Sequence, residues 1–327
     1  MKNILVLGAT GFIGGHIAKK ALENDWHVNG FRRNPNSTGN IAENSINWIS
    51  GDLDDYASLV EAMTGMDYVF HAGAWYPTDQ NPKRAEGSLR QAAEQMNKVI
   101  KAAAQARIKR LIYTSSLTTI ALPPAGEDRY ANENDIYQLG TMPGNAYYEG
   151  KSIMEGQALE AAGAGQNIVI LNPTLVLGPG DTKLSSSEIL VMIAKGQAKA
   201  VPAGMINIID VRDVAEAHIN AARTGRSGQR YILGGENYQI MEAVKIITDM
   251  ANVKPPLFKL SNRWIDLYIK MGDLIPFIPN APYHLKAYQH WQGFQIEKAE
   301  NELKLGRIML EETARDSIKW FINQGVL

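Results

Sequence analysis

Short apolar runs alternate with longer amphipathic stretches along the first half of the chain. Runs rich in Ile, Val, Tyr, Phe or Leu predict buried strands. They cover 4–7, 28–31, 47–50, 68–71, 110–114 and 168–171. Apolar residues that recur with helical period predict helices over 12–24, 56–63, 84–106 and 146–162. The alternation predicts an α/β fold of the Rossmann type, a doubly wound parallel sheet with helices on both faces. Such sheets bind ligands at the carboxyl ends of their strands.

The pattern changes beyond residue 172, where Pro and Gly interrupt shorter elements. We predict that 1–172 form a first domain and that 206–233 return to it. The remaining stretches, 173–205 and 234–327, are predicted to form a smaller, interleaved C-terminal unit. For the aromatic-rich segment 264–294, we consider a lid, a partner surface, a lipid-facing patch, or simple packing against the core.

Three glycines follow the first strand at intervals of three residues. Glycines in this place permit a tight turn and a close approach of the backbone to a pyrophosphate, which the N-terminus of the next helix attracts. The spacing departs from the fingerprint in which one residue separates the first two glycines. Its position between a strand and a helix favours a dinucleotide site over a plain turn. The candidate cofactor contacts of this segment are Gly8, Thr10, Gly11, Phe12, Ile13 and Gly14.

The second strand ends in Arg32 and Arg33, where NAD sites usually carry an acid that bonds the ribose 2′-OH. An acid there would repel a 2′-phosphate, whereas guanidinium groups bind one. The pair therefore favours NADP(H) as the cofactor; the alternative is two solvated surface arginines. Asp52 and Leu53, just after the third strand, are candidates for contact with the adenine ring, although a solvated Asp at a strand end explains the sequence equally well.

Tyr147 and Lys151 are four residues apart in a predicted helix, so they lie on one face, one turn apart. An unperturbed tyrosine has a pKa near 10. A neighbouring ammonium and a cationic nicotinamide favour the phenolate, so Tyr147 can exchange a proton with a carbonyl at neutral pH. Ser116, at the end of the fifth strand, is our first candidate to hold that carbonyl, and Ser115 is the second; the alternative for both is hydrogen bonding within the loop. Tyr148 is assigned to the cleft wall or the core.

The composition excludes several classes of protein. The chain has 327 residues, 45% of them hydrophobic, and a formal net charge of −1, which argues against nucleic-acid binding. It has no cysteine, so disulfides and thiolate chemistry are excluded, and no metal site is expected. No apolar run approaches the ~20 residues of a membrane span. A strand that begins at residue 3 leaves no room for a signal peptide, so we expect a cytoplasmic protein.

These motifs together resemble the extended short-chain dehydrogenase/reductases of the NAD-dependent epimerase/dehydratase superfamily. The resemblance covers nearly the whole chain and includes the glycine cradle, VFHAGA at 69–74, YTSS at 113–116 and the Tyr–Lys pair. Within that family, NAYYEGK at 145–151 and NPTLVLGP at 172–179 are similar to the dihydroflavonol reductase and cinnamoyl-CoA reductase branch. The resemblance implies that 72–74 pack beside the cofactor, that Pro173 closes over the nicotinamide and that Arg33 binds the 2′-phosphate. The three residues of 72–74 are Ala72, Gly73 and Ala74.

Two positions depart from the patterns of this superfamily. Glu149 stands where the plant reductases carry Tyr or another aromatic residue, and Asn172 stands where the sugar-nucleotide branch usually has Arg. Both departures concern the substrate rather than the hydride chemistry. Trp75 and Tyr76 follow the fourth strand and are expected to line the cleft. The helices over 84–106 and 146–162 either pair across a two-fold axis, giving a homodimer, or simply cover the sheet.

The leading functional hypothesis is an NADP(H)-dependent reductase of the aldehyde or ketone group of a small, fairly apolar molecule. Ser116, Tyr147 and Lys151 would be its catalytic residues, and the C-terminal unit would bind the substrate. The alternative is a nucleotide-sugar epimerase or dehydratase that retains NAD. A third reading is a non-catalytic dinucleotide-binding sensor, against which the intact Ser–Tyr–Lys set argues.

Overall fold

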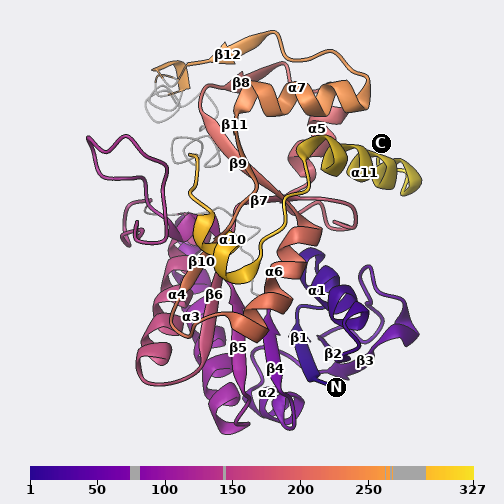
Figure 1. Ribbon diagram of the computed structural model, residues 1–327, viewed down its shortest axis with the longest axis vertical. Helices are drawn as coiled ribbons and strands as arrows, with labels where there is room; N and C mark the ends of the chain where they lie inside the picture. Colours follow the sequence, from indigo (N-terminus) through magenta and orange to yellow (C-terminus); the bar gives the residue numbers. More distant parts are fainter. Residues whose placement is uncertain (74–81, 143–144, 262, 266, 268–291) are drawn as a thin grey trace.

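A computed structural model of the chain describes residues 1–73, 82–142, 145–261, 263–265, 267 and 292–327 (Figure 1). The predicted strands and helices of the first domain are all present. The strands are β1 (Asn3–Leu7), β2 (His27–Arg32), β3 (Asn47–Ser50), β4 (Tyr68–His71), β5 (Arg110–Thr114) and β6 (Ile168–Pro173). The helices are α1 (Phe12–Glu23), α2 (Tyr56–Met63), α3 (Pro82–Gln105) and α4 (Ala146–Gly163). Two short 3-10 helices, η1 (Glu43–Ser45) and η2 (Leu117–Thr119), follow β2 and β5.

A seven-stranded parallel sheet forms the larger part of the molecule, in the order β10-β6-β5-β4-β1-β2-β3. The strand order reverses beside β1, which is the doubly wound arrangement and confirms the predicted fold class. Alternate residues of each strand enter different cores, because successive side chains point to opposite faces. Val6 and Ile112 pack beneath α1 and α6 (Val211–Thr224), whereas Leu7 and Tyr113 pack beneath α2, α3 and α4.

Successive segments of the second half of the chain belong alternately to the large sheet and to a smaller unit (Figure 1). β10 (Arg230–Leu233) pairs with β6, and α6 packs against α1. β7 (Leu175–Leu177), β9 (Met205–Asp210) and β11 (Glu236–Gln239) form a separate three-stranded sheet. Of the segment 206–233, therefore, α6 and β10 lie with the large sheet and β9 lies in the smaller one. The division into a cofactor unit and a substrate unit stays a prediction.

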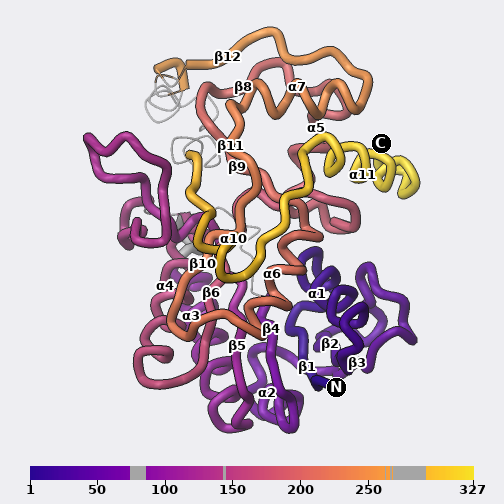
Figure 2. The backbone as a smooth tube through the Cα atoms, in the orientation of Figure 1, coloured from indigo at the N-terminus to yellow at the C-terminus, as the bar shows by residue number. Residues whose placement is uncertain are grey.

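The smaller unit has a core of its own. The two-stranded sheet of β8 (Ala200–Pro202) and β12 (Phe258–Leu260) adjoins α5 (Glu188–Ala194), α7 (Ile240–Ala251) and α11 (Leu310–Asn323). Leu190, Val244 and Phe321 of these helices are buried together with Ile208 of β9. α10 (Glu297–Leu303) leads back beside α6 and β10 before the chain reaches α11 (Figure 2). No described helix is long and apolar enough to cross a membrane.

Candidate active site

The glycine turn after β1 leaves no room for side chains. Gly8 adopts φ +89°, a conformation that L side chains rarely adopt, and its carbonyl accepts a hydrogen bond of 2.9 Å from Gly11 N. A Cβ at Gly8 would lie 2.5 Å from Gly73 N, and a Cβ at Gly14 would lie 2.2 Å from Gly8 O. The turns after β1 and β4 are therefore in close backbone contact, which only glycine permits.

The N-terminus of α1 opens directly from this turn. Its N-cap is Gly11, and no side chain caps the helix. The first backbone N–H groups can therefore donate hydrogen bonds to a ligand. The loop after β2 closes on the turn from the other side, because Gly39 takes φ +59° with Thr10 O only 2.5 Å from where its Cβ would be. Phe12 meets His16 edge to face at 5.8 Å, and Ile13 packs against the core.

The two arginines at the end of β2 have different surroundings. The Arg32 guanidinium donates two hydrogen bonds to Glu43, of 3.2 and 2.9 Å, and lies 4.6 Å from the centre of the Trp48 ring. Arg32 is therefore held against the protein, whereas Arg33 is exposed to solvent. The local sequence pattern did not distinguish the two arginines; the family resemblance implied Arg33 as the ligand of the 2′-phosphate, and that role stays a prediction.

The candidate adenine contacts lie in the turn between β3 and α2. The Asp52 carboxylate accepts a hydrogen bond of 3.0 Å from Asp54 N, and its carbonyl accepts one from Asp55 N. Leu53 packs at the edge of the core beneath α2 and α3. Asp52 thus has a structural role in the turn, and contact with adenine stays a prediction.

Tyr147 and Ser116 come together at the carboxyl end of β5. Asn145 caps α4 by accepting a hydrogen bond from Tyr148 N, so Tyr147 lies in the first helical turn. The Tyr147 hydroxyl donates a hydrogen bond of 3.3 Å to Ser116 Oγ. The proton donor and the carbonyl-orienting hydroxyl expected from sequence are therefore adjacent.

Lys151 lies one turn further along α4. Its ammonium donates a hydrogen bond of 3.0 Å to Thr114 O and stands 5.4 Å from the centre of the Tyr113 ring. Desolvation lowers the pKa of Lys151 to about 8, while the charge of Glu155 acts in the opposite direction. This lysine can consequently change charge near neutral pH.

The remaining predicted residues are placed as follows. Pro173 ends β6 at the carboxyl edge of the sheet, and Ala72 and Gly73 follow β4. Ser115 is buried and its hydroxyl interacts with the side chain of Tyr113, whereas Tyr147 bonds Ser116. The candidates that lie outside the described residues are Ala74, Trp75 and Tyr76; so does most of 264–294.

A buried polar network that sequence reasoning missed supports the catalytic strand end. Arg230 Nε lies 2.7 Å from Glu155 Oε1, and both side chains are at most 6% exposed. Arg230 also donates to Thr119 O at 2.7 Å. The Thr119 hydroxyl lies 2.7 Å from Glu155 Oε2 and 3.0 Å from Ser116 O, and it can donate its single proton to either. Asn172 Nδ2 donates to Glu155 Oε2 at 2.6 Å. One signal was available: Glu155 is four residues after Lys151, on the helix face that also carries Tyr147.

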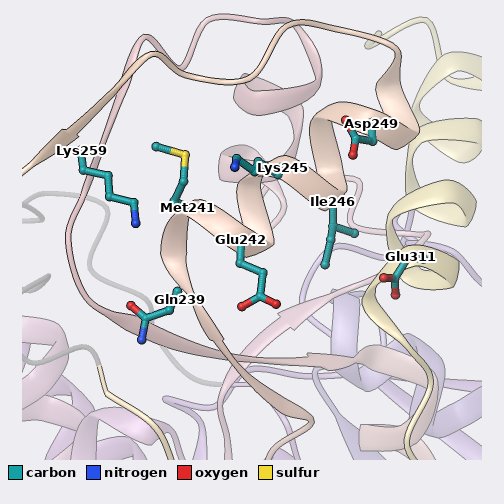
Figure 3. Close-up of a pocket in the computed structure, with 8 residues that line it drawn as sticks. All are labelled: Gln239, Met241, Glu242, Lys245, Ile246, Asp249, Lys259 and Glu311. Carbon is teal, nitrogen blue, oxygen red and sulfur yellow. The ribbon is translucent and has the colours of Figure 1, made fainter.

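The hollow drawn in Figure 3 lies on another part of the molecule. It measures about 500 Å³ and is lined by residues of α7, together with Gln239 of β11, Lys259 of β12 and Glu311 of α11. Its side chains are mostly solvated ions, and none belongs to the Ser116–Tyr147–Lys151 group. The described residues contain no group of three or more His, Asp or Glu side chains that could hold a metal.

The NAD dependent epimerase/dehydratase family matches residues 4–234 of this chain. A Synechocystis sp. protein provisionally named dihydroflavonol 4-reductase is 31% identical over 98% of this chain and 94% of its own length. Cinnamoyl-CoA reductase 2 of Arabidopsis thaliana is 34% identical over 75% of this chain and 76% of its own. The predicted resemblance is thereby confirmed.

Solved structures agree over the whole chain. The structure named gox2253 has a TM-score of 0.86 and 27% identity, covering 100% of both chains. Vestitone reductase from alfalfa (Medicago sativa) has a TM-score of 0.76 and 21% identity, again covering 100% of both chains; at that identity the likeness shows the fold alone.

Proposed function

Because the chain belongs to the NAD dependent epimerase/dehydratase family, we propose that it is an NADP(H)-dependent reductase of aldehydes or ketones on small, fairly apolar molecules. The observation that carries this proposal is the hydrogen bond between Tyr147 and Ser116 beside Lys151. The names of the relatives, which are dihydroflavonol and cinnamoyl-CoA reductases, support it.

The described residues fit a dinucleotide. Glycines at 8 and 14 permit the tight turn that leads from β1 into α1, and α1 presents uncapped N–H groups there for a pyrophosphate. Arg33 is exposed at the end of β2, where a 2′-phosphate would need a cation. The dinucleotide, when bound, would supply the hydride.

The protein's own residues would handle the proton and the orientation of the substrate. The Ser116 hydroxyl donates to the substrate carbonyl oxygen and holds it beside Tyr147. The Tyr147 hydroxyl gives its proton to that oxygen as negative charge develops on it. Lys151, one turn away on α4, stabilises the negative charge left on the tyrosine oxygen. In the reverse direction Tyr147 would take the proton from the alcohol.

The test of this proposal is NADPH consumption. We expect stoichiometric oxidation of NADPH when the purified protein meets aldehydes and ketones of moderate size, such as trans-cinnamaldehyde, with NADP released after each turnover. Failure to oxidise NADPH with any member of such a panel would contradict the proposal. NAD retained through purification would instead support the epimerase or dehydratase alternative.

The cofactor preference should depend on Arg33. We expect Arg33→Ala to weaken NADPH binding by about 10- to 100-fold, because one charge-assisted hydrogen bond contributes about 1.5–3 kcal/mol. NADH binding should stay within about 2-fold, since NADH lacks the 2′-phosphate. Calorimetric titration measures both, with Arg315→Ala on the exposed face of α11 as the control. An equal loss for both cofactors would contradict the assignment.

The activity should fall as the pH rises through about 8, the pKa to which burial lowers Lys151. Below that pH the lysine is charged and supports proton transfer from Tyr147, whereas above it the charge is lost. We expect kcat/KM for NADPH-dependent reduction to be flat from about pH 6 to 7 and to decline beyond about 8. In Lys151→Arg, whose guanidinium stays protonated, the decline in residual activity should disappear from this range. An unchanged profile would assign the decline to another group.

A further inference from the structure

Glu149 is a buried carboxylate at the start of α4, two residues after Tyr147. Its side chain is 8% exposed, and the described residues provide no cation within salt-bridge distance. Its oxygens instead accept hydrogen bonds from the Tyr137 hydroxyl at 2.7 Å and from Gly140 N at 2.9 and 3.1 Å. Burial of a charge is costly unless it is well bonded, so these contacts define a specific position for the carboxylate.

The bonds of Glu149 fasten the segment 137–142 onto the first turn of α4. The Tyr137 hydroxyl, which donates to Glu149, also accepts a hydrogen bond of 2.8 Å from Met142 N. The segment is held at its beginning as well, because Tyr137 N donates to Thr119 O at 3.1 Å. Glu149 is therefore the centre of a closed set of hydrogen bonds whose donors come from residues 137, 140 and 142.

A chain of aromatic contacts leads from this anchor to the proposed proton donor. The rings of Tyr137 and Tyr148 lie 5.9 Å apart between centres, and those of Tyr148 and Tyr147 lie 6.5 Å apart, nearly perpendicular. Tyr137, Met142 and Tyr148 form one buried cluster, and Tyr147 packs against it from the more exposed side. A displacement of the anchored segment would therefore disturb the aromatic packing beside Tyr147.

The anchored segment also presents apolar side chains to solvent. Leu139 is 60% exposed, and Ile136 just before the segment is 57% exposed. Large apolar side chains on a backbone that several hydrogen bonds fix in place are suited to contact an apolar ligand.

We infer that Glu149 is a positioning residue for the substrate: it fixes the segment 137–142 so that exposed Leu139, backed by the buried Tyr137–Tyr148 cluster, gives an apolar contact to a substrate held at Tyr147. This inference rests on the proposed reductase function and adds to it the class of substrate. The substrate would carry an apolar group close to its carbonyl. It also explains the departure at position 149, where an aromatic residue of the plant reductases gives way to a carboxylate that recruits a loop.

The test compares Glu149→Leu, Glu149→Gln and Tyr137→Phe with the wild type, using trans-cinnamaldehyde and NADPH. We expect Glu149→Leu to raise KM for the aldehyde by about 10-fold or more while kcat stays within about 3-fold, because the apolar contact is lost but Tyr147 and Ser116 remain. Tyr137→Phe keeps the ring and removes one bridge, so its KM should rise by about 3-fold. Glu149→Gln keeps one oxygen for Tyr137 but opposes an amino group to Gly140 N, so it should fall between wild type and Glu149→Leu.

Controls separate positioning from folding. Glu160→Leu makes the same chemical change on the exposed side of α4 and should leave KM and kcat unchanged. The Kd for NADPH should be unchanged in every variant. Hydrogen exchange of the amides of 137–142 should accelerate in Glu149→Leu and stay at the wild-type rate in Glu160→Leu.

The experiment separates a failure of this inference from a failure of the proposed reductase function. Faster exchange at 137–142 with an unchanged KM would overturn the inference, and so would kcat and NADPH binding falling together with a normal KM. If the wild type does not reduce trans-cinnamaldehyde, the reductase proposal fails for this class of carbonyl. The inference is then judged from the Kd of trans-cinnamaldehyde in the presence of NADP+, which must weaken by about 10-fold in Glu149→Leu.

Discussion

Replacing Tyr147 with phenylalanine is expected to lower kcat by about 10²- to 10⁴-fold, the usual contribution of a positioned general acid. The substitution removes only the hydroxyl that donates to Ser116 Oγ, and the ring keeps its packing against the cluster of Tyr137, Met142 and Tyr148. NADPH binding should therefore be unchanged. The measurement is the rate of NADPH oxidation at saturating aldehyde, together with the Kd for NADPH.

The matched control for this variant is Tyr56→Phe. Tyr56 begins α2, and its hydroxyl donates a hydrogen bond of 2.6 Å to Gln105 Oε1. Neither residue belongs to the Ser116–Tyr147–Lys151 group. Its removal should leave kcat within about 2-fold. A Tyr147→Phe variant that keeps wild-type turnover would contradict the assignment of the proton donor, whereas a variant that loses NADPH binding as well would show that the substitution disturbs more than the hydroxyl.

The second large effect is expected on stability, from the buried ion pair between Glu155 and Arg230. Arg230→Met should lower the free energy of unfolding by about 3–5 kcal/mol, because it leaves the Glu155 carboxylate buried without its cation. Glu155→Leu should lower the free energy of unfolding by a similar amount, because it leaves the Arg230 guanidinium buried without its anion. The double variant Glu155→Leu/Arg230→Met removes both charges and should recover most of the loss. Equilibrium unfolding in urea measures all three, and the cycle gives the coupling between the two positions.

An exposed ion pair provides the comparison. Arg307 Nη2 lies 2.5 Å from Glu300 Oε1, and the two side chains are 47% and 34% exposed. Arg307→Met should cost no more than about 1 kcal/mol, because solvent screens both charges. If Arg230→Met is no more destabilising than Arg307→Met, or if the double variant is as unstable as both single variants combined, the buried pair does not act as we describe.

The network around Glu155 shows why part of the site was outside the reach of sequence reasoning. Its members, Thr119, Glu155, Asn172 and Arg230, come from η2, α4, β6 and β10. In the sequence, Asn172 was notable only because the sugar-nucleotide branch usually has Arg at this position. In the structure, its side-chain amide donates a hydrogen bond to the buried Glu155 carboxylate. Only the parallel pairing of β6 with β10 brings Arg230 beside α4, and no local spacing encodes that pairing.

The same limit applies to Arg32 and Arg33. The local pattern presents two guanidinium groups at the end of a strand, where a cation favours NADP(H), and only the family resemblance singled out Arg33. The structure separates them, because Glu43 and Trp48 return from the next loop and strand to hold Arg32, and Arg33 is left exposed. The choice depends on how the loop after β2 folds back, which the sequence pattern does not specify.

The fold class, the glycine turn and the Tyr147–Lys151 pair could all be predicted from the amino-acid sequence, because each depends on short-range rules. Strand and helix periodicity is local, only glycine tolerates the turn at Gly8, and a spacing of four places two side chains on one face of a helix. The packing of distant elements placed Ser116, the first candidate, against Tyr147. It also set the surroundings of Arg32 and the partners of Glu149 and Glu155. Those answers depend on distances between elements far apart in the chain, and burial and desolvation, which set the energies of such charges, exist only once the elements have packed.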